Sequence, residues 1–448
     1  METTMKRIEN SLGWKLAIFA LIAYYAQLGV FRIIGMVNQQ WLADNAENAS
    51  LILPIILLDI IAFPLFLLLT RKLPKTEVGN EKITVGKFIV GIPVMSFIVL
   101  TGSLIGAAIQ GLLTPSSSTA GLAEVLTGSS LFWRVLYVGI LAPIVEELIF
   151  RKTIIDRLAY KGKWFAIFVS ALCFGLFHGN FAQFFYAFVL GIVWGVIYTR
   201  TGKIYITMGY HLIINMSSSV IGAVLAGKMD PLVPSSMVPF YSFVGLRIIL
   251  AVIGLIVIIA TGKKVFKLDD EEGLKGGKLF KSAFSSWGLW IYYVLCIGIF
   301  VITIVSGRVQ AKAANTISIA DEFEVTVADG KADINEKEYP FSIYVEGDYV
   351  VKYDWFDNEK PGFIMGVRVE SEDGTSMFEC SGALLKADML PTHLKAGTYK
   401  VVLTVLESEE EFADYAKKYF DEVINLNYDK LGLDGKYNIK ASFTFTKN

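Results

Sequence analysis

Residues 143–151 read Pro-Ile-Val-Glu-Glu-Leu-Ile-Phe-Arg, and they end an apolar run that begins at Leu131. This run places two adjacent carboxylates, Glu146 and Glu147, in a segment otherwise suited to hydrocarbon. A charged side chain in a membrane span is energetically expensive, so it is by default a candidate functional group. Two further motifs bring polar side chains into apolar surroundings, Phe174 with His178 and His211 with Asn215. Together these residues predict a site buried in a membrane helix bundle.

The composition separates the chain into two parts. Of its 448 residues, 54% are hydrophobic, which excludes an ordinary soluble domain and predicts a multi-pass membrane protein. Residues 1–306 carry 25 Lys and Arg against 16 Asp and Glu, a balance of +9, and residues 307–448 carry 16 against 26, a balance of −10. We therefore expect a transmembrane helix bundle at 1–306, a separate soluble domain at 307–448, and no nucleic-acid partner.

Apolar runs and basic loops predict the membrane topology. A run of about 20 residues crosses about 30 Å of hydrocarbon at about 1.5 Å per residue. Basic residues gather in loops 71–87 and 151–163, whereas loops 38–50 and 114–130 contain none. The positive-inside rule then predicts a plasma-membrane protein with a cytoplasmic N-terminus and an extracytoplasmic C-terminal domain. Nine candidate spans lie near 13–34, 51–69, 87–113, 131–150, 164–178, 181–199, 204–226, 244–262 and 287–306.

The spacing around the two carboxylates predicts different tasks for them. Glu147 and Arg151 are four residues apart, so they share a helix face and are expected to form a supporting ion pair. Glu146 is turned about 100° away from Glu147 and is free to face the bundle interior as a general base. Pro143 removes a helix hydrogen bond one turn earlier, and a kink there could make room for a water beside Glu146.

The two histidine pairs complete a candidate hydrolytic site. His211 and Asn215 share one helix face and make a plausible oxyanion hole. A water held by Glu146 and His178 could attack a peptide carbonyl while that pair stabilises the oxyanion, without a covalent intermediate. Phe174 is expected to pack rather than react. We expect a cavity reached from the cytoplasmic half of the membrane.

These motifs resemble those of one family. Glu146-Glu147-Leu-Ile-Phe-Arg151, Phe174-Gly-Leu-Phe-His178 and His211-Leu-Ile-Ile-Asn215 are similar, in order and spacing, to the motifs of the CPBP intramembrane proteases. That family includes type II CAAX prenyl endopeptidases and bacterial proteins linked to bacteriocin self-immunity. The resemblance covers a core at about 131–227. It implies an intramembrane endopeptidase of bacterial type, in which Glu146 and His178 activate water while His211 and Asn215 bind the oxyanion.

Alternatives remain open at this point. The family is often called a metalloprotease, and Glu146, His178 and His211 could hold Zn²⁺. The chain has no His-Glu-x-x-His sequence, so water activation without a cofactor is the preferred interpretation. One rival is a non-catalytic immunity protein or peptide-binding scaffold. Another is a proton-coupled transporter, although no repeated half is evident. Beyond membrane lipids, the expected partner is a membrane-associated peptide or protein substrate.

The acidic C-terminal part predicts a β-rich, sandwich-like domain. Segments that alternate apolar and polar residues are separated by turn residues such as Asp373-Gly374. A capping box at Ser408 and Glu411 predicts one helix as far as Val423. Its role is unassigned, and its acidic surface could bind a basic peptide or an envelope partner. The expected strands are 323–327, 341–345, 349–355, 363–369, 399–406 and 436–446.

Overall fold

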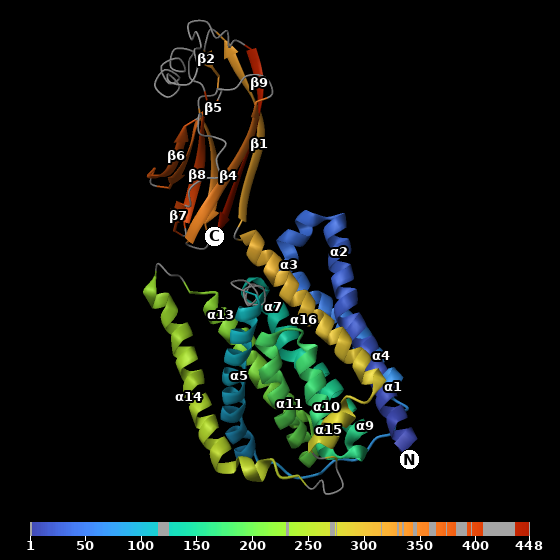
Figure 1. The fold of residues 1–448 in the computed structure, drawn as a ribbon. Helices are drawn as coiled ribbons and strands as arrows, with labels where there is room; N and C mark the ends of the chain where they lie inside the picture. Colours follow the sequence, from blue (N-terminus) through green and yellow to red (C-terminus); the bar gives the residue numbers. More distant parts are fainter. Residues whose placement is uncertain are drawn as a thin grey trace. The chain divides into compact units, whose positions relative to one another are not determined.

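The protein divides into two compact units, Met1–Arg308 and Val309–Asn448 (Figure 1). The first is a helical bundle and the second is built of strands. The computed structural model describes residues 2–114, 125–229, 233–268, 274, 276–314, 316–328, 331–333, 336–343, 347–357, 364–372, 374–381, 392–395, 397–405 and 435–447.

The first half of the bundle consists of long helical segments that switch between α and π hydrogen bonding. Polar side chains cap some of their starts: Asn38 accepts from the Trp41 N–H at 2.9 Å, and Thr84 accepts from the Lys87 N–H at 3.3 Å. The segments are α1 (Glu2–Ala20), η1 (Leu21–Ala26), α2 (Gln27–Val37), α3 (Gln39–Pro54), η2 (Ile55–Ala62), α4 (Phe63–Thr70) and α5 (Val85–Leu113).

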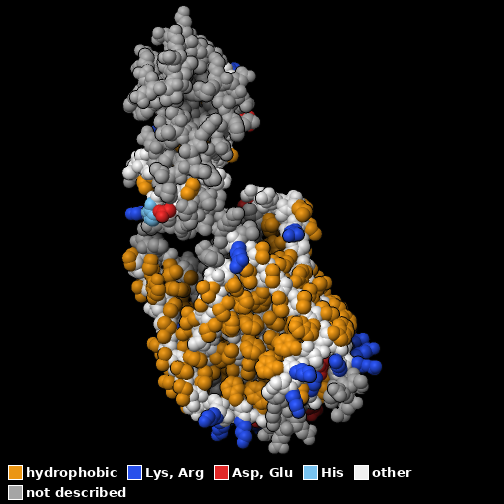
Figure 2. Space-filling model, in the orientation of Figure 1, with side chains coloured by type: hydrophobic (Ala, Val, Ile, Leu, Met, Phe, Trp, Pro, Cys, Tyr) orange, Lys and Arg blue, Asp and Glu red, His pale blue; other side chains and the backbone are white. Residues whose placement is uncertain are grey.

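The second half of the bundle carries the polar motifs. Its segments are α7 (Leu131–Trp133), η3 (Arg134–Leu141), α8 (Ala142–Glu146), η4 (Glu147–Ile155), α9 (Asp156–Leu158), η5 (Ala159–Lys161), α10 (Lys163–Phe177), α11 (Phe181–Thr201), α12 (Ile204–Asn215), η6 (Met216–Ile221), α13 (Gly222–Ala226), α14 (Pro234–Val265), α15 (Gly276–Ala283) and α16 (Trp287–Ala314). Figure 2 shows hydrophobic side chains covering the visible face of this unit, with Lys and Arg gathered toward one end.

The predicted membrane bundle is confirmed, with a difference in two of its nine spans. Seven helices of the described residues are long and apolar enough to cross a membrane. The predicted span at 131–150 is helical, but it carries Arg134, Glu146 and Glu147 and alternates between α and π segments. The predicted span at 164–178 is α10, whose 15 residues extend only about 22 Å. These two segments carry Glu146 and lead to His178, whereas His211 and Asn215 lie on one of the seven long helices.

Small residues allow α5 and α11 to approach closely. A Cβ added at Gly102 would lie 2.7 Å from the Tyr186 backbone, and one at Gly106 would lie 2.1 Å from the Phe181 carbonyl oxygen. One turn farther along α5, the Gln110 side chain accepts the Phe181 N–H at 3.0 Å. This small-xxx-small pattern is typical of membrane helix contacts, and it fixes the start of α11 against α5.

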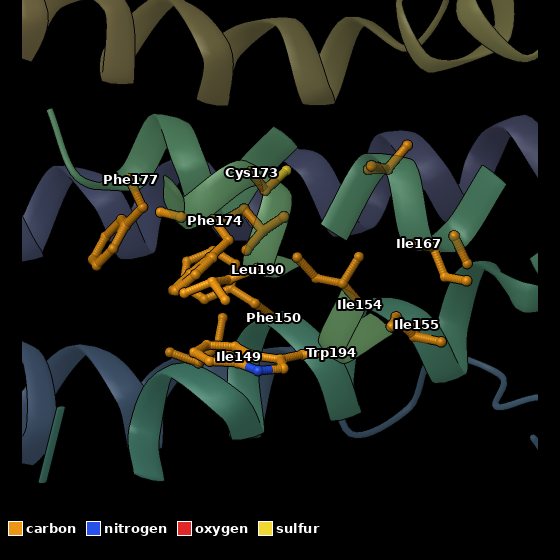
Figure 3. Close-up of a cluster of buried hydrophobic side chains, with 14 of the residues drawn as sticks. Ile149, Phe150, Ile154, Ile155, Ile167, Cys173, Phe174, Phe177, Leu190 and Trp194 are labelled. Carbon is orange, nitrogen blue, oxygen red and sulfur yellow. The ribbon is translucent and has the colours of Figure 1, made fainter. Parts of the chain in front are cut away.

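An aromatic and aliphatic core packs behind the motif helices. Figure 3 shows Phe150, Phe174, Leu190 and Trp194 gathered side by side in this cluster. The ring centroids of Phe150 and Phe174 are 5.3 Å apart, and both side chains are essentially fully buried. These contacts hold η4, α10 and α11 together and so fix the backbone that carries the site.

The second unit consists of two antiparallel sheets, which confirms the predicted β-rich domain. The strand orders are β2-β1-β9-β4-β7 and β3-β8-β5-β6. Phe341 of one sheet stacks on Phe445 of the other with ring centroids 4.4 Å apart, so the sheets pack face to face. The predicted helix after Ser408 lies outside the described residues. The strands are β1 (Thr316–Ala328), β2 (Lys331–Ala332), β3 (Glu336–Ile343), β4 (Gly347–Asp357), β5 (Ile364–Ser371), β6 (Ser376–Ser381), β7 (Thr392–Leu394), β8 (Gly397–Val405) and β9 (Gly435–Lys447).

Candidate active site

A cavity of about 350 Å³ inside the helical unit brings the predicted polar residues together. Glu146, His178, His211 and Asn215 all contribute to its wall, and Phe174 lines it beside them. Further polar and aromatic residues complete the lining, among them Tyr24, Gln27, Ser50, Tyr137, Gln183, Tyr186, Trp194 and Ser219. Four residues from three separate motifs therefore face one cavity.

The π segments surround this cavity. η1, η2, η3 and η6 each supply lining residues, namely Tyr24, Leu58, Tyr137 and Ser219, and η4 begins immediately after Glu146. A π turn inserts one residue into the helix, and such turns occur frequently at functional sites. Each inserted residue rotates the side chains that follow it around the helix axis. The residues that line the cavity therefore do not recur at a strict 3.6-residue period.

His211 lies between the two adjacent carboxylates. Its Nδ1 is 3.1 Å from Glu147 Oε1, and its Nε2 is 3.6 Å from Glu146 Oε2. Because an ionised carboxylate only accepts hydrogen bonds, the Nδ1 contact places the hydrogen of a neutral His211 ring on Nδ1. Nε2 of that ring is then an acceptor that faces Glu146. The oxyanion role predicted for His211 therefore requires a second proton on this ring.

Glu147 and Arg151 form the predicted supporting pair. Arg151 Nη2 lies 3.4 Å from Glu147 Oε1, and both side chains are fully buried. The guanidinium also lies over the rings of Phe174 and Trp194, at 4.0 and 5.1 Å from their centroids. Glu146, in contrast, keeps 14% of its side chain exposed. Arg151 and the two aromatic rings thus hold Glu147 as a fixed acceptor for His211, while Glu146 remains open to the cavity.

His178 sits at a sharp reversal between α10 and α11. Its Nδ1 is 2.9 Å from the Phe174 carbonyl oxygen, which can only accept, so Nδ1 donates and Nε2 of the neutral ring has a free lone pair. Gly179 follows with φ +65°, and a Cβ there would lie 2.4 Å from Ile299. Glycine therefore permits the turn that ends α10 at this histidine.

Asn215 satisfies a backbone carbonyl that Pro143 leaves without its helical partner. In this π turn the Ala142 N–H donates to the Tyr137 carbonyl, five residues back. The next carbonyl in the pattern, that of Val138, would accept from residue 143, but proline has no N–H. Asn215 Nδ2 donates to the Val138 oxygen instead, at 3.0 Å. One of the two amide hydrogens predicted for the oxyanion is therefore used on the backbone.

This arrangement predicts that Asn215 and Pro143 are energetically coupled. Asn215→Ala should lower the free energy of unfolding by about 1 kcal/mol, because it removes the hydrogen bond to a part-buried carbonyl. In a Pro143→Ala background the loss should be smaller, because residue 143 then supplies an N–H. Equilibrium unfolding of the four proteins in detergent measures the coupling. Equal losses in both backgrounds would show that Asn215 does not replace the missing N–H.

The alternative zinc site is not assembled in this arrangement. In the part of the chain that the structure describes, no three His, Cys, Asp or Glu side chains converge in a way that could hold a metal ion. His211 directs Nδ1 to Glu147, and His178 directs Nδ1 to a backbone carbonyl. Both contacts leave Nε2 free, as in metal-binding histidines, but Glu146, His178 and His211 do not converge on a shared metal position among the described residues.

Two features of the site differ from the sequence-based expectation. The cavity extends to Ser50, Val125 and Leu126, which belong to the segments without basic residues, 38–50 and 114–130. It therefore reaches toward the end of the bundle opposite the basic loops, not toward the end that was predicted. Sequence reasoning also missed lining residues such as Gln183 and Tyr186. Their signal was weak, since a single amide or phenol in an apolar span is common.

Comparison with known proteins agrees with the motifs. Residues 128–217 match the family model described as "Type II CAAX prenyl endopeptidase Rce1-like". A curated relative from Bacillus subtilis (strain 168), described as "Putative membrane peptidase YdiL", is 29% identical over 155 residues. That alignment covers 33% of this chain and 63% of the relative, so the chain spans less than two thirds of the relative's length. All the predicted site residues lie within 128–217.

Proposed function

Because residues 128–217 belong to the Rce1-like type II CAAX prenyl endopeptidase (CPBP) family, we propose that this chain is an intramembrane endopeptidase. Its substrate is a membrane-associated peptide or protein. The observation that carries the proposal is the convergence of Glu146, His178, His211 and Asn215 on one cavity inside the bundle. We further propose that the end of the bundle with the basic loops lies in the cytoplasm and that the β-rich unit lies outside it, because the positive-inside rule favours this orientation.

In the proposed reaction, Glu146 and His178 hold and activate water. Glu146 retains exposure to the cavity, and the His178 Nε2 lone pair can accept a hydrogen from the same water. The water oxygen attacks the peptide carbonyl while its proton moves to Glu146. When the carbon–nitrogen bond breaks, Glu146 returns a proton to the leaving amine. Once Glu146 has taken up the water proton it can donate to Nε2 of His211, which Glu147 holds, and the remaining amide hydrogen of Asn215 stabilises the oxyanion.

The first test compares membranes that contain the wild-type protein with membranes that contain Glu146→Ala. Mass spectrometry of new peptide termini should reveal termini that are present with the wild type and missing with the variant. The same two membrane samples treated with a zinc chelator decide whether cleavage needs a metal. Glu81→Gln serves as control, because Glu81 is an exposed partner of Arg200. Identical terminus lists for wild type and Glu146→Ala, with both proteins folded, would favour a non-catalytic binding protein.

A further inference from the structure

Tyr186 presents a phenol to the same space as the proposed water-activating residues. It lies on α11 and lines the cavity together with Glu146 and His178. Its ring lies 6.2 Å from the His178 ring at an interplanar angle of 73°. None of the three sequence motifs includes this tyrosine, yet it borders the reaction space on the His178 side.

A chain of hydrogen bonds fixes the direction of the Tyr186 hydroxyl. Asn180 Nδ2 donates to Gln183 Oε1 at 2.8 Å, so the amide nitrogen of Gln183 faces the other way. Gln183 Nε2 then donates to the Tyr186 oxygen at 3.0 Å. Since the hydroxyl oxygen already accepts this bond, its own hydrogen is available as a donor to whatever occupies the cavity.

The backbone under Tyr186 is held in place by two neighbours. Gly102 of α5 packs directly against it, because a Cβ at residue 102 would lie 2.7 Å from the Tyr186 backbone. Asn180 caps the start of α11 by accepting the Gln183 N–H at 2.9 Å, and it also donates to the His178 carbonyl at 2.8 Å. The hydroxyl therefore has a preorganised position relative to His178, as an oxyanion donor requires.

The other candidate donors are partly engaged. The neutral His211 ring uses its hydrogen on Glu147, and Asn215 uses one amide hydrogen on the Val138 carbonyl. We propose that the Tyr186 hydroxyl donates a hydrogen bond to the carbonyl oxygen of the scissile peptide and so shares the oxyanion with Asn215. This inference rests on the proposed endopeptidase function. Tyr186 keeps its proton throughout, while the water proton passes to Glu146 and then to the leaving amine.

The test uses a synthetic peptide that spans the cleavage site mapped by the termini that are lost in Glu146→Ala. The rate of its cleavage is compared between the wild type and Tyr186→Phe. We expect kcat to fall about 100- to 1,000-fold with KM nearly unchanged, because the donor acts on the transition state. Tyr205→Phe, which alters an exposed tyrosine, should leave the rate unchanged. Tyr24→Phe and Tyr137→Phe test the other two phenols of the cavity wall.

Gln183→Glu provides a second test with Tyr186 still present. A carboxylate cannot donate to the phenol oxygen and would instead accept its hydrogen, which removes that hydrogen from the substrate. We expect kcat to fall at least 10-fold, with the wild-type unfolding transition retained. If cleavage depends on Glu146 but is unaffected by Tyr186→Phe, the inference about Tyr186 is wrong and the proposed function stands. The same holds if cleavage is lost with Tyr24→Phe or Tyr137→Phe instead. Without any Glu146-dependent termini, the proposed function and this inference both fail.

Discussion

Replacing Glu146 with glutamine is expected to lower the rate of cleavage by about 100- to 10,000-fold, which is the usual contribution of a general base. Glutamine has nearly the same size and fits the same place beside His211 Nε2, 3.6 Å away. It cannot accept a proton from water, so the chemical step should fail while the bundle remains folded. Binding of the substrate should survive, because the shape of the cavity is unchanged.

The matched control for this variant changes the neighbouring carboxylate together with its charged partner. Glu147→Gln/Arg151→Met keeps an oxygen that can accept from His211 Nδ1, and it removes both buried charges at once. We expect its rate to stay within about tenfold of the wild type, since positioning rather than proton transfer is affected. Rates should be measured as the appearance of Glu146-dependent termini, at equal amounts of folded protein. If the double variant were inactive and Glu146→Gln active, the proposed roles of the two carboxylates would be reversed.

Helical periodicity predicted much of this site because its motifs are local. Residues four apart share a face on any α-helix, so the pairing of Glu147 with Arg151 followed from spacing alone. The apolar length of the spans and the alternation of the strands predicted a helical bundle with a β-rich unit, because burial sets those patterns. The meeting of three motifs in one cavity was predicted from their polar character in apolar spans.

The contacts between different helices were harder to predict from the sequence. A turn of 100° per residue suggested that Glu146 and Glu147 face different neighbours, yet His211 lies between them. The chain changes to π hydrogen bonding at Glu147, and nothing in the local sequence marks such a change. The use of Asn215 on the Val138 carbonyl likewise depends on how α12 and η3 pack, which spacing within one helix does not reveal.

The network around Tyr186 was missed for a related reason. Its members Asn180, Gln183 and Tyr186 follow a helical spacing of three, but each alone reads as an ordinary polar residue near a helix start. Its position at the cavity depends on the Gly102 contact between α5 and α11, two helices far apart in the sequence. The proposed envelope partner of the β-rich unit and the substrate of the membrane unit stay predictions.

The buried ion pair leads to a second large effect, this time on stability. Arg151→Met alone is expected to lower the free energy of unfolding by about 3–5 kcal/mol, because it leaves Glu147 buried without its countercharge. Methionine can still pack against Phe174 and Trp194, the rings that the guanidinium covers in the wild type. The loss of unfolding free energy therefore comes from the uncompensated Glu147 carboxylate and not from a cavity left by the shorter contacts. Thermal unfolding in detergent and the yield of folded protein provide the measurement.

Replacing both members of the Glu147–Arg151 pair should lower the free energy of unfolding far less than replacing either one. In Glu147→Gln/Arg151→Met no charge is left unmatched, and replacement of a buried ion pair by neutral side chains of similar volume is often neutral or stabilising. Glutamine at 147 still accepts from His211 Nδ1, so the link from η4 to α12 is kept. We therefore expect the double variant to recover most of the stability that Arg151→Met loses. Equal instability of the single and double variants would mean that the guanidinium acts through its contacts with Phe174 and Trp194, and that its charge contributes little.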